Sequence, residues 1–306
     1  MVGKENGSIF VYPVNQITFM LSRKKLFWTG LVIFLGVSIR ISAQENAIVQ
    51  EGEYGLSLGA AHYFGDLNPA SHLNRPKLAL GAFFRKQFGS YVALRVAGHF
   101  AQVGYSDIYN TQNEFDLRRN LSFNSHIWEL AVQGDFNFFK YIPGSETNRF
   151  TPYVTFGVGV FNFDPYTYYQ GQKIFLRPLG TEGQGSSVYP TRKPYSSMAV
   201  CFPLGLGLKY SVNARMNLGF EMVYRFTGTD YLDDVSTTYA PDAQPHFMPD
   251  GSATTWYALQ DRSGAVGAPI GIKDRQRGYS NQKDSYLLAE FSVTFNISSY
   301  RCPTAQ

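Results

Sequence analysis

The chain has 306 residues, a formal net charge of +4 and an aromatic content of 16%. Its first 43 residues carry five of the 27 basic residues and one of the 23 acidic residues, which leaves 22 of each sign in the remainder. A remainder without net charge gives no reason to expect a nucleic-acid partner. The mean hydropathy of −0.19 is too polar for a helical membrane protein, and it is ordinary for a membrane barrel with a wet interior.

The N-terminal segment has the three-part layout of a secretory signal peptide. A basic cluster at 23–25 precedes an apolar run at 26–37, and a small residue, Ala43, stands where cleavage is expected. A membrane-spanning helix needs ~20 apolar residues, and Arg40 interrupts this run earlier. We therefore predict a leader over residues 1–43, with translation starting at Met1 or Met20, and one domain over 44–306.

After the leader, apolar residues alternate with small or polar residues in eight segments of about ten residues each, and no helical period separates them. Side chains of a strand point alternately to opposite faces, so each segment has one apolar face and one mostly wet face. Eight such segments behind an export signal predict an all-β fold, a transmembrane antiparallel β-barrel of eight strands. The expected strands are 54–63, 78–87, 91–103, 127–138, 152–163, 197–210, 215–226 and 285–297.

The charged residues of these strands fall on the face opposite to the apolar one. A charge facing lipid costs ~2–4 kcal/mol near the midplane, so these side chains are expected to face the lumen and to pair there. Four basic and four acidic residues predict a lumen plugged by ion pairs rather than an open pore. The lumen ion-pair candidates are Arg85, Arg95, Glu129, Asp135, Lys209, Glu221, Arg225 and Glu290.

Short and long connections alternate along the chain. The long ones, at 64–77, 104–126, 164–196 and 227–284, are the first, third, fifth and seventh. An even number of strands with both termini in the periplasm places those four outside the cell. The protein is therefore expected to be integral to the outer membrane, in contact with its lipid, with periplasmic termini.

No residue pattern indicates catalysis or a cofactor. The five histidines are scattered and form no Ser/His/acid or metal-ligand spacing, which favours a non-enzymatic protein without a cofactor or small-molecule substrate. Cys201 is expected in a strand and Cys302 in the tail, toward opposite ends of the barrel, which argues against a disulfide. Glycine pairs such as Gly157/Gly159 lie inside strands, with no phosphate-loop context.

An acidic cluster of unknown role, formed by Asp230, Asp233 and Asp234, lies in the longest connection. It could supply oxygen ligands to a cation, but it lacks the spaced ligands and central glycine of a calcium loop. A structured turn or a docking surface is the favoured interpretation.

Several segments, in order, resemble PorG-type proteins, the outer-membrane barrel component of the type IX secretion system of Bacteroidetes. Residues 53–59 (EYGLSLG) and 63–67 (YFGDL) are similar to their first strand. Further similar segments are 119–123 (RNLSF), 127–129, 136–139, 150–153, 161–165 (FNFDP), 178–185 (PLGTEGQG) and 229–235 (TDYLDDV).

The resemblance implies a role in protein secretion and not a reaction. PorG-type barrels are thought to tether a periplasmic ring, made of a lipoprotein and its ring partner, in a machine that exports enzymes and gliding adhesins. No catalytic residue is carried over from the family. The periplasmic candidates for partner contact are the turn 139–151, the residues before the first strand and the tail after Ile297.

The alternative is a stand-alone small barrel whose exposed loops act in adhesion or structure. A conducting pore and a surface enzyme are disfavoured by the balanced lumen charge and by the absence of catalytic spacing. The face assignment predicts that Leu206→Arg, toward lipid, impairs assembly and that Gly207→Ser, toward the lumen, is milder.

Overall fold

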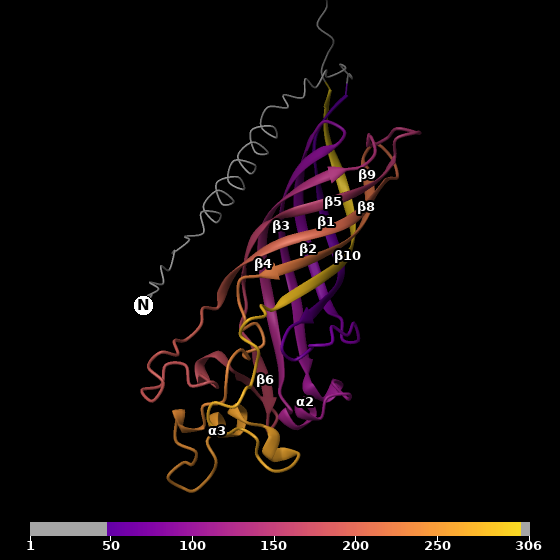
Figure 1. Ribbon diagram of the computed structural model, residues 1–306. Helices are drawn as coiled ribbons and strands as arrows, with labels where there is room; N and C mark the ends of the chain where they lie inside the picture. The colour runs from indigo at the N-terminus through magenta and orange to yellow at the C-terminus, as the bar shows by residue number, and fades with distance from the viewer. Residues whose placement is uncertain (1–47, 301–306) are drawn as a thin grey trace, which may run out of the picture. The chain divides into compact units, whose positions relative to one another are not determined.

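Eight antiparallel strands form a closed barrel in the computed structural model, which describes residues 48–300 (Figure 1). Neighbouring strands pair in the order β3-β2-β1-β10-β9-β8-β5-β4, and a further pairing of β3 with β4 closes the cylinder. The barrel strands are β1 (Ile48–Phe64), β2 (Lys77–Phe88), β3 (Val92–Ser106), β4 (Ser122–Asn137), β5 (Phe150–Asn162), β8 (Met198–Ser211), β9 (Met216–Thr227) and β10 (Ser285–Tyr300). The expected leader, Cys302 and the end of the tail lie outside the described residues.

All eight strands predicted from the alternation are present, and the predicted closed antiparallel barrel is confirmed. The largest differences are at β1, which begins at Ile48, six residues earlier than expected, and at β4, which begins at Ser122, five residues earlier. Phe123 and Ser125 continue the pairing with β3 there, at Tyr105 and Val103. Register with a neighbouring strand, rather than local composition, decides where this strand begins.

The outer surface of the barrel is apolar. Leu56, Leu206 and Phe291 are exposed by 68%, 63% and 69%, whereas polar neighbours such as Ser57 are buried. This inside-out distribution is what hydrocarbon around the barrel requires, since every backbone group is paired within the closed sheet. The protein is therefore an integral outer-membrane β-barrel. Among residues 48–300, no helix is long and apolar enough to cross a membrane.

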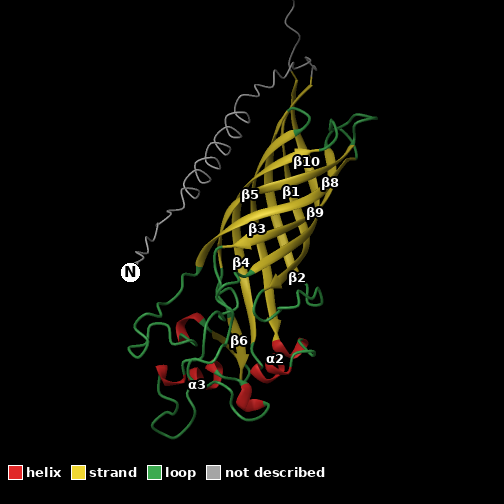
Figure 2. Cartoon of the chain, in the orientation of Figure 1, coloured by secondary structure: helices red, strands yellow, loops and turns green. Residues whose placement is uncertain are grey.

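The two ends of the barrel differ. Three short connections, 89–91, 138–149 and 212–215, lie at the end where Ile48 and Tyr300 also lie. The four long connections gather at the other end and carry all the helices labelled in Figure 2. We call these four connections the cap; its residues are 65–76, 107–121, 163–197 and 228–284.

The cap has secondary structure that the alternation did not predict. Its elements are the hairpin β6 (Tyr166–Tyr169) and β7 (Gln172–Phe175), the helices α2 (Glu114–Arg119) and α3 (Thr255–Gln260), and the 3₁₀ turns Asp107–Tyr109, Arg177–Leu179, Pro241–Ala243 and Ser263–Ala265. Both helices are capped by side chains: Asn113 accepts a hydrogen bond from the Phe115 N–H, and Thr254 accepts one from Tyr257. Helices of six residues are too short to give a periodic sequence signal.

The main hydrophobic core lies where the cap meets the barrel mouth. Phe123, Ile127 and Phe161 from the wall pack in one buried cluster with Leu232 and Val235 from the longest connection. This junction holds the larger cluster of apolar side chains that the chain buries away from both lipid and water. The cap is thereby fixed onto the mouth of the barrel.

Candidate functional site

The lumen holds a network of buried charges. All eight lumen residues predicted from the sequence are buried inside the barrel, none more than 5% exposed. Glu53, at the start of β1, joins them and forms an ion pair with Arg85. The predicted strand began one residue later, at Tyr54, but Glu53 shares its parity with Ser57, and this was the signal that could have placed it in the lumen.

The ion pairs join the strands of the barrel through the lumen, and one of them spans it. Arg95 on β3 lies 2.6 Å from Glu221 on β9, and these two strands are on opposite sides of the closed sheet. Asp135 lies 2.6 Å from Arg85, 3.7 Å from Arg95 and 3.5 Å from Lys209. The Arg95–Glu221 pair spans the lumen, and the Asp135 pairs join strands one or two places apart, so together they fill the cross-section of the barrel, as expected for eight strands.

Nearer the cap, the same pattern continues with tyrosines. Arg225 lies 3.2 Å from Glu129, and the Tyr286 hydroxyl donates to Glu129 Oε2 at 2.5 Å across the barrel. The Tyr153 hydroxyl donates to Glu221 Oε2 at 2.6 Å. Each of these carboxylates therefore has both a cation and a hydroxyl as partners, which offsets part of the cost of burying it.

The structure also brings Ser57, His99 and Glu290 together, a grouping that the sequence spacing did not indicate. Ser57 Oγ donates to Glu290 Oε1 at 3.1 Å, and His99 Nδ1 lies 3.2 Å from Glu290 Oε2. In a hydrolytic triad the imidazole lies between the hydroxyl and the carboxylate, whereas here the carboxylate lies between the other two. All three side chains are buried in the wall and lumen, so the arrangement fits cross-strand bonding and not acyl transfer.

Glycines on the lumen face leave the space that the buried lumen side chains occupy. A Cβ at Gly207 would lie 2.3 Å from the Tyr153 ring, so any side chain there must displace the ring that bonds Glu221. That Gly207→Ser is milder than Leu206→Arg stays a prediction, and this contact predicts that Gly207→Ser has a cost of its own. The alternation gave the face of Gly207 correctly, but it carried no information about the cross-strand ring.

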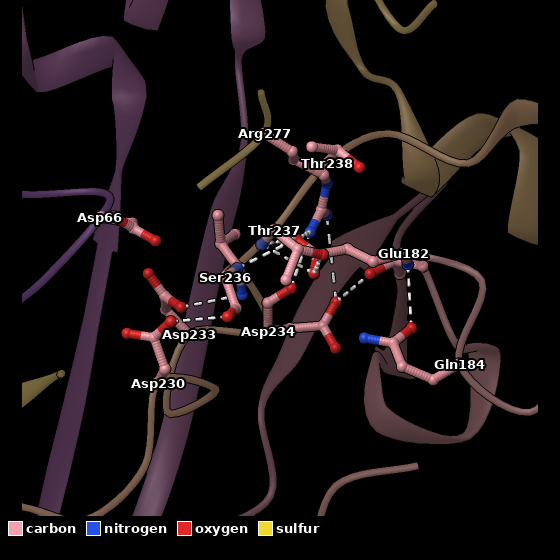
Figure 3. Close-up of polar contacts among 12 residues, drawn as sticks. Asp66, Glu182, Gln184, Asp230, Asp233, Asp234, Ser236, Thr237, Thr238 and Arg277 are labelled. Atoms are coloured by element: carbon pink, nitrogen blue, oxygen red, sulfur yellow. Dashed lines mark hydrogen bonds and ion pairs between the residues drawn. The ribbon is translucent and has the colours of Figure 1, made fainter. Parts of the chain in front are cut away.

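In the cap, two segments far apart in sequence are bonded to each other (Figure 3). Glu182, in the segment 178–185, accepts hydrogen bonds from the backbone N–H groups of Ser236 at 2.9 Å and Thr237 at 3.0 Å, and it forms an ion pair with Arg277 at 3.1 Å. Asp234 accepts from the Thr181 hydroxyl at 2.6 Å. The loop segments 178–185 and 229–235 thus build one structure.

The loop 178–185 needs its glycines for this. Gly180, Gly183 and Gly185 all have φ between 62° and 83°, a conformation that other residues adopt at a cost. The turn directs the Glu182 carboxylate toward the backbone at 236–237. Gln184 Oε1 accepts a hydrogen bond from the Glu182 N–H at 2.9 Å. The glycines therefore serve a tight loop and not a phosphate site.

The acidic cluster predicted in the longest connection is buried rather than solvated. Asp230, Asp233 and Asp234 are 4%, 1% and 0% exposed. Asp234 has the positively charged partner Arg277, at 4.0 Å, and also accepts from the Tyr195 hydroxyl at 2.6 Å. Burial raises the pKa of Asp234 to about 6 in spite of these partners.

Asp230 and Asp233 lie among two further carboxyls, Asp66 from the connection after β1 and Asp284 from the end of the longest connection. None of the four forms an ion pair with another described side chain. Burial raises the pKa of Asp230 to about 7 and that of Asp66 to about 6, and it raises the pKa values of Asp233 and Asp284 well above the usual range. Within residues 48–300, no three His, Cys, Asp or Glu side chains converge as metal ligands would.

A family model described as "Domain of unknown function (DUF6089)" matches residues 28–177, just under half of the chain. No curated protein matches. Similar solved structures include the N-terminal β-barrel domain of OprF from Pseudomonas aeruginosa, with 9% identity, 81% of this chain and 100% of that chain covered, and a TM-score of 0.34.

Two further similar structures are a Neisserial surface protein and a Yersinia pestis protein. Neisserial surface protein A has 7% identity and a TM-score of 0.38, over 82% of this chain and 98% of that one. Ail, the attachment invasion locus protein of Yersinia pestis, has 9% identity and a TM-score of 0.36, over 81% of this chain and 99% of that one. Because these sequence identities and TM-scores are low, the description of the fold rests on the strand pairing of this chain itself.

Proposed function

We propose that this protein is a non-enzymatic subunit of a type IX-like protein secretion machine, in which the barrel anchors a periplasmic ring assembly to the outer membrane. The observation that carries the proposal is where the segments that resemble PorG-type proteins lie in the fold. Residues 178–185 and 229–235 are bonded to each other in the cap through Thr181 and Asp234, and Glu129 of the segment 127–129 belongs to the lumen network, so these segments contribute to the closed barrel and its cap.

The closed lumen supports a structural role for the barrel rather than conduction of solutes. Contacts of 2.6 Å between Arg95 and Glu221, and of 2.5 Å between Tyr286 and Glu129, join opposite walls at two levels. A solute would have to break buried, charge-assisted bonds to pass, which is costly. A steady open channel in planar bilayers would contradict this part of the proposal.

We place the periplasmic ring at the end of the barrel that carries the short turns. With periplasmic termini, the turn 138–149 faces the periplasm together with the tail after Ile297. This turn presents the exposed charges Lys140 and Glu146, while Tyr141 anchors it by burial. The cap then lies on the cell surface, where it braces the barrel.

The decisive experiment is a mild-detergent pull-down of the tagged protein from its native outer membrane. Recovery of a periplasmic lipoprotein and its ring partner in a fixed ratio is the expected result. Reversing the turn charges with Lys140→Glu and Glu146→Lys should reduce that recovery, whereas Asp250→Lys, at an exposed position in the cap, should not. A barrel recovered alone in every case would overturn the proposal.

The second candidate is a stand-alone surface barrel acting in adhesion or structure. It is favoured by the exposed apolar tip of the longest connection, where Phe247 and Met248 precede a tight turn closed by the bond from Gly251 N to Met248 O, 2.9 Å. Removal of this tip by protease on intact cells, with no co-purifying periplasmic protein, would favour this candidate over the secretion subunit.

A further inference from the structure

Four carboxyl groups at the junction of cap and barrel lie near enough to raise one another's pKa values, and none of them forms an ion pair with a described side chain. We call them the carboxyl cluster; its members are Asp66, Asp230, Asp233 and Asp284. They come from three places in the chain: the segment just after β1, the beginning of the β9–β10 connection and the end of that connection. Asp230, Asp233 and Asp284 are each at most 4% exposed. Ionised carboxylates in such a place need compensation, because burial removes their hydration.

The hydrogen bonds within the cluster require a proton beyond those of its neutral donors. The Tyr63 hydroxyl lies 2.5 Å from Asp233 Oδ2 and 3.2 Å from Asp284 Oδ1. A hydroxyl has one proton to donate, so it serves one carboxylate, and the other contact is a bond only if that second carboxyl carries a proton itself. The remaining oxygens, Asp233 Oδ1 and Asp284 Oδ2, are occupied by backbone N–H groups at 2.9 Å.

Asp230 points to the same conclusion. Its Oδ2 accepts from the Ser236 hydroxyl at 2.5 Å, while its Oδ1 is buried without a hydrogen-bond partner among the described residues. An unpartnered oxygen of an ionised, buried carboxylate is costly, and a protonated carboxyl reduces that cost. Asp66 Oδ2 accepts only the backbone N–H of Tyr279, at 2.9 Å.

The basic groups near the cluster are engaged elsewhere. Arg119 donates to Asp107 at 2.7 and 2.8 Å, and Arg277 pairs with Glu182. Lys283 is exposed, and its Nζ donates to a backbone carbonyl. The ionisable groups that face the cluster from the elements packed around it are Tyr63 of β1, Arg119 of α2, Glu182 and Tyr195 of the β7–β8 connection, and Tyr231, Asp234, Arg277 and Lys283 of the β9–β10 connection.

We propose that the carboxyl cluster is a proton-held clasp, in which shared protons fasten both ends of the β9–β10 connection to the end of β1. When the clasp loses its protons, like charges at close range separate these three segments. Leu232 lies between Asp230 and Asp233, and Val235 follows Asp233 by two residues. Both belong to the core at the barrel mouth, so release of the clasp loosens that core. The cap is therefore tight in acid and loose in alkali.

The direction of the pH dependence follows from linkage. The carboxyls titrate near pH 4 when the cap is open and at higher pH when it is closed, so the closed cap binds more protons between those limits. The stabilisation is complete below about pH 4 and is lost as the pH rises through about 6 for Asp66 and about 7 for Asp230. Burial and the neighbouring carboxyls raise the pKa values of Asp233 and Asp284 well above the usual range, so these two groups contribute to the loss in the same direction.

The test is backbone hydrogen exchange of the full-length protein in lipid nanodiscs from pH 5.5 to 8.5, with chelator present and rates corrected for intrinsic pH dependence. In the wild type, protection of peptides covering 229–236 and 278–284 should fall at least tenfold over this range. Peptides from β9 should keep their protection and report an intact barrel. Unchanged protection of the cap peptides across the range would overturn the proposal.

Substitutions that replace a carboxyl by a neutral amide distinguish loss of the clasp from a general loss of exchange protection at alkaline pH. Asp284→Asn and Asp230→Asn keep the shape and the acceptor oxygen but carry no charge, so both should retain protection at pH 8.5. Asp250→Asn, an exposed carboxyl in the same connection, is the matched control and should follow the wild type. Asn variants with the wild-type profile would contradict the proposal. The same would hold if 1 mM calcium restored wild-type protection at pH 8.5, since a cation would then be the neutralising group.

Discussion

Removing the charge of Glu221 tests the reasoning about the lumen most directly. The substitution Glu221→Gln keeps the side-chain shape and an acceptor oxygen. It leaves Arg95 with a carboxylate, Asp135, at 3.7 Å and with the Thr155 hydroxyl at 3.2 Å. Arg95 is fully buried, so the lost Coulomb partner is not replaced by water.

The expected cost is about 3 kcal/mol in the free energy of unfolding. Loss of one partner from a buried ion pair costs roughly 3–5 kcal/mol. The lower end applies here because Asp135 remains and because the amide oxygen of Gln still accepts from Arg95 and Tyr153. The double variant Arg95→Met with Glu221→Gln removes both charges, and its cost should fall short of the sum of the single costs by about 2 kcal/mol.

The assay is reversible urea unfolding of the refolded barrel in lipid vesicles, followed by tryptophan fluorescence and by the mobility shift of folded barrel in detergent gels. Glu146→Gln, at an exposed position in the turn 138–149, is the matched control and should change the free energy by less than about 0.5 kcal/mol. A Glu221→Gln variant within 1 kcal/mol of wild type, or strict additivity in the double variant, would refute the wall-to-wall network as a source of stability.

Three further substitutions test other parts of the structure. Leu206→Arg, exposed at 63% on the lipid face, should cost ~2–4 kcal/mol and reduce the folded yield, whereas Leu206→Val should fold normally. Gly207→Ala, by displacing Tyr153, should destabilise the barrel despite adding a single methyl group, and equal stability would show that the ring can move freely. Arg277→Met strips Glu182 of its cation and should increase protease cleavage of the cap but not of the barrel, as measured by mass spectrometry; cleavage of both alike would mean that the cap is not a separate cooperative unit.

The sequence by itself determined the barrel and its two faces. Alternation is a local property with a period of two, so Leu206 and Gly207 are assigned to opposite faces without knowledge of any neighbour. The same reasoning placed Arg95 and Glu221 inside, since a charge on the lipid side is too costly. For this reason all eight strands and the sides of their charged residues could be read from composition and spacing.

Only the tertiary structure decided which groups meet. That Arg95 faces Glu221 across the lumen depends on the register of every strand between them and on the closure of β3 against β4. The carboxyl cluster depends on the packing of three distant segments, because Asp66 and Asp284 are separated by most of the chain. The alternation along a strand predicts neither contact. The Arg95–Glu221 contact is fixed by the geometry of barrel closure, and the carboxyl cluster is fixed by irregular loops, whose backbone has no period.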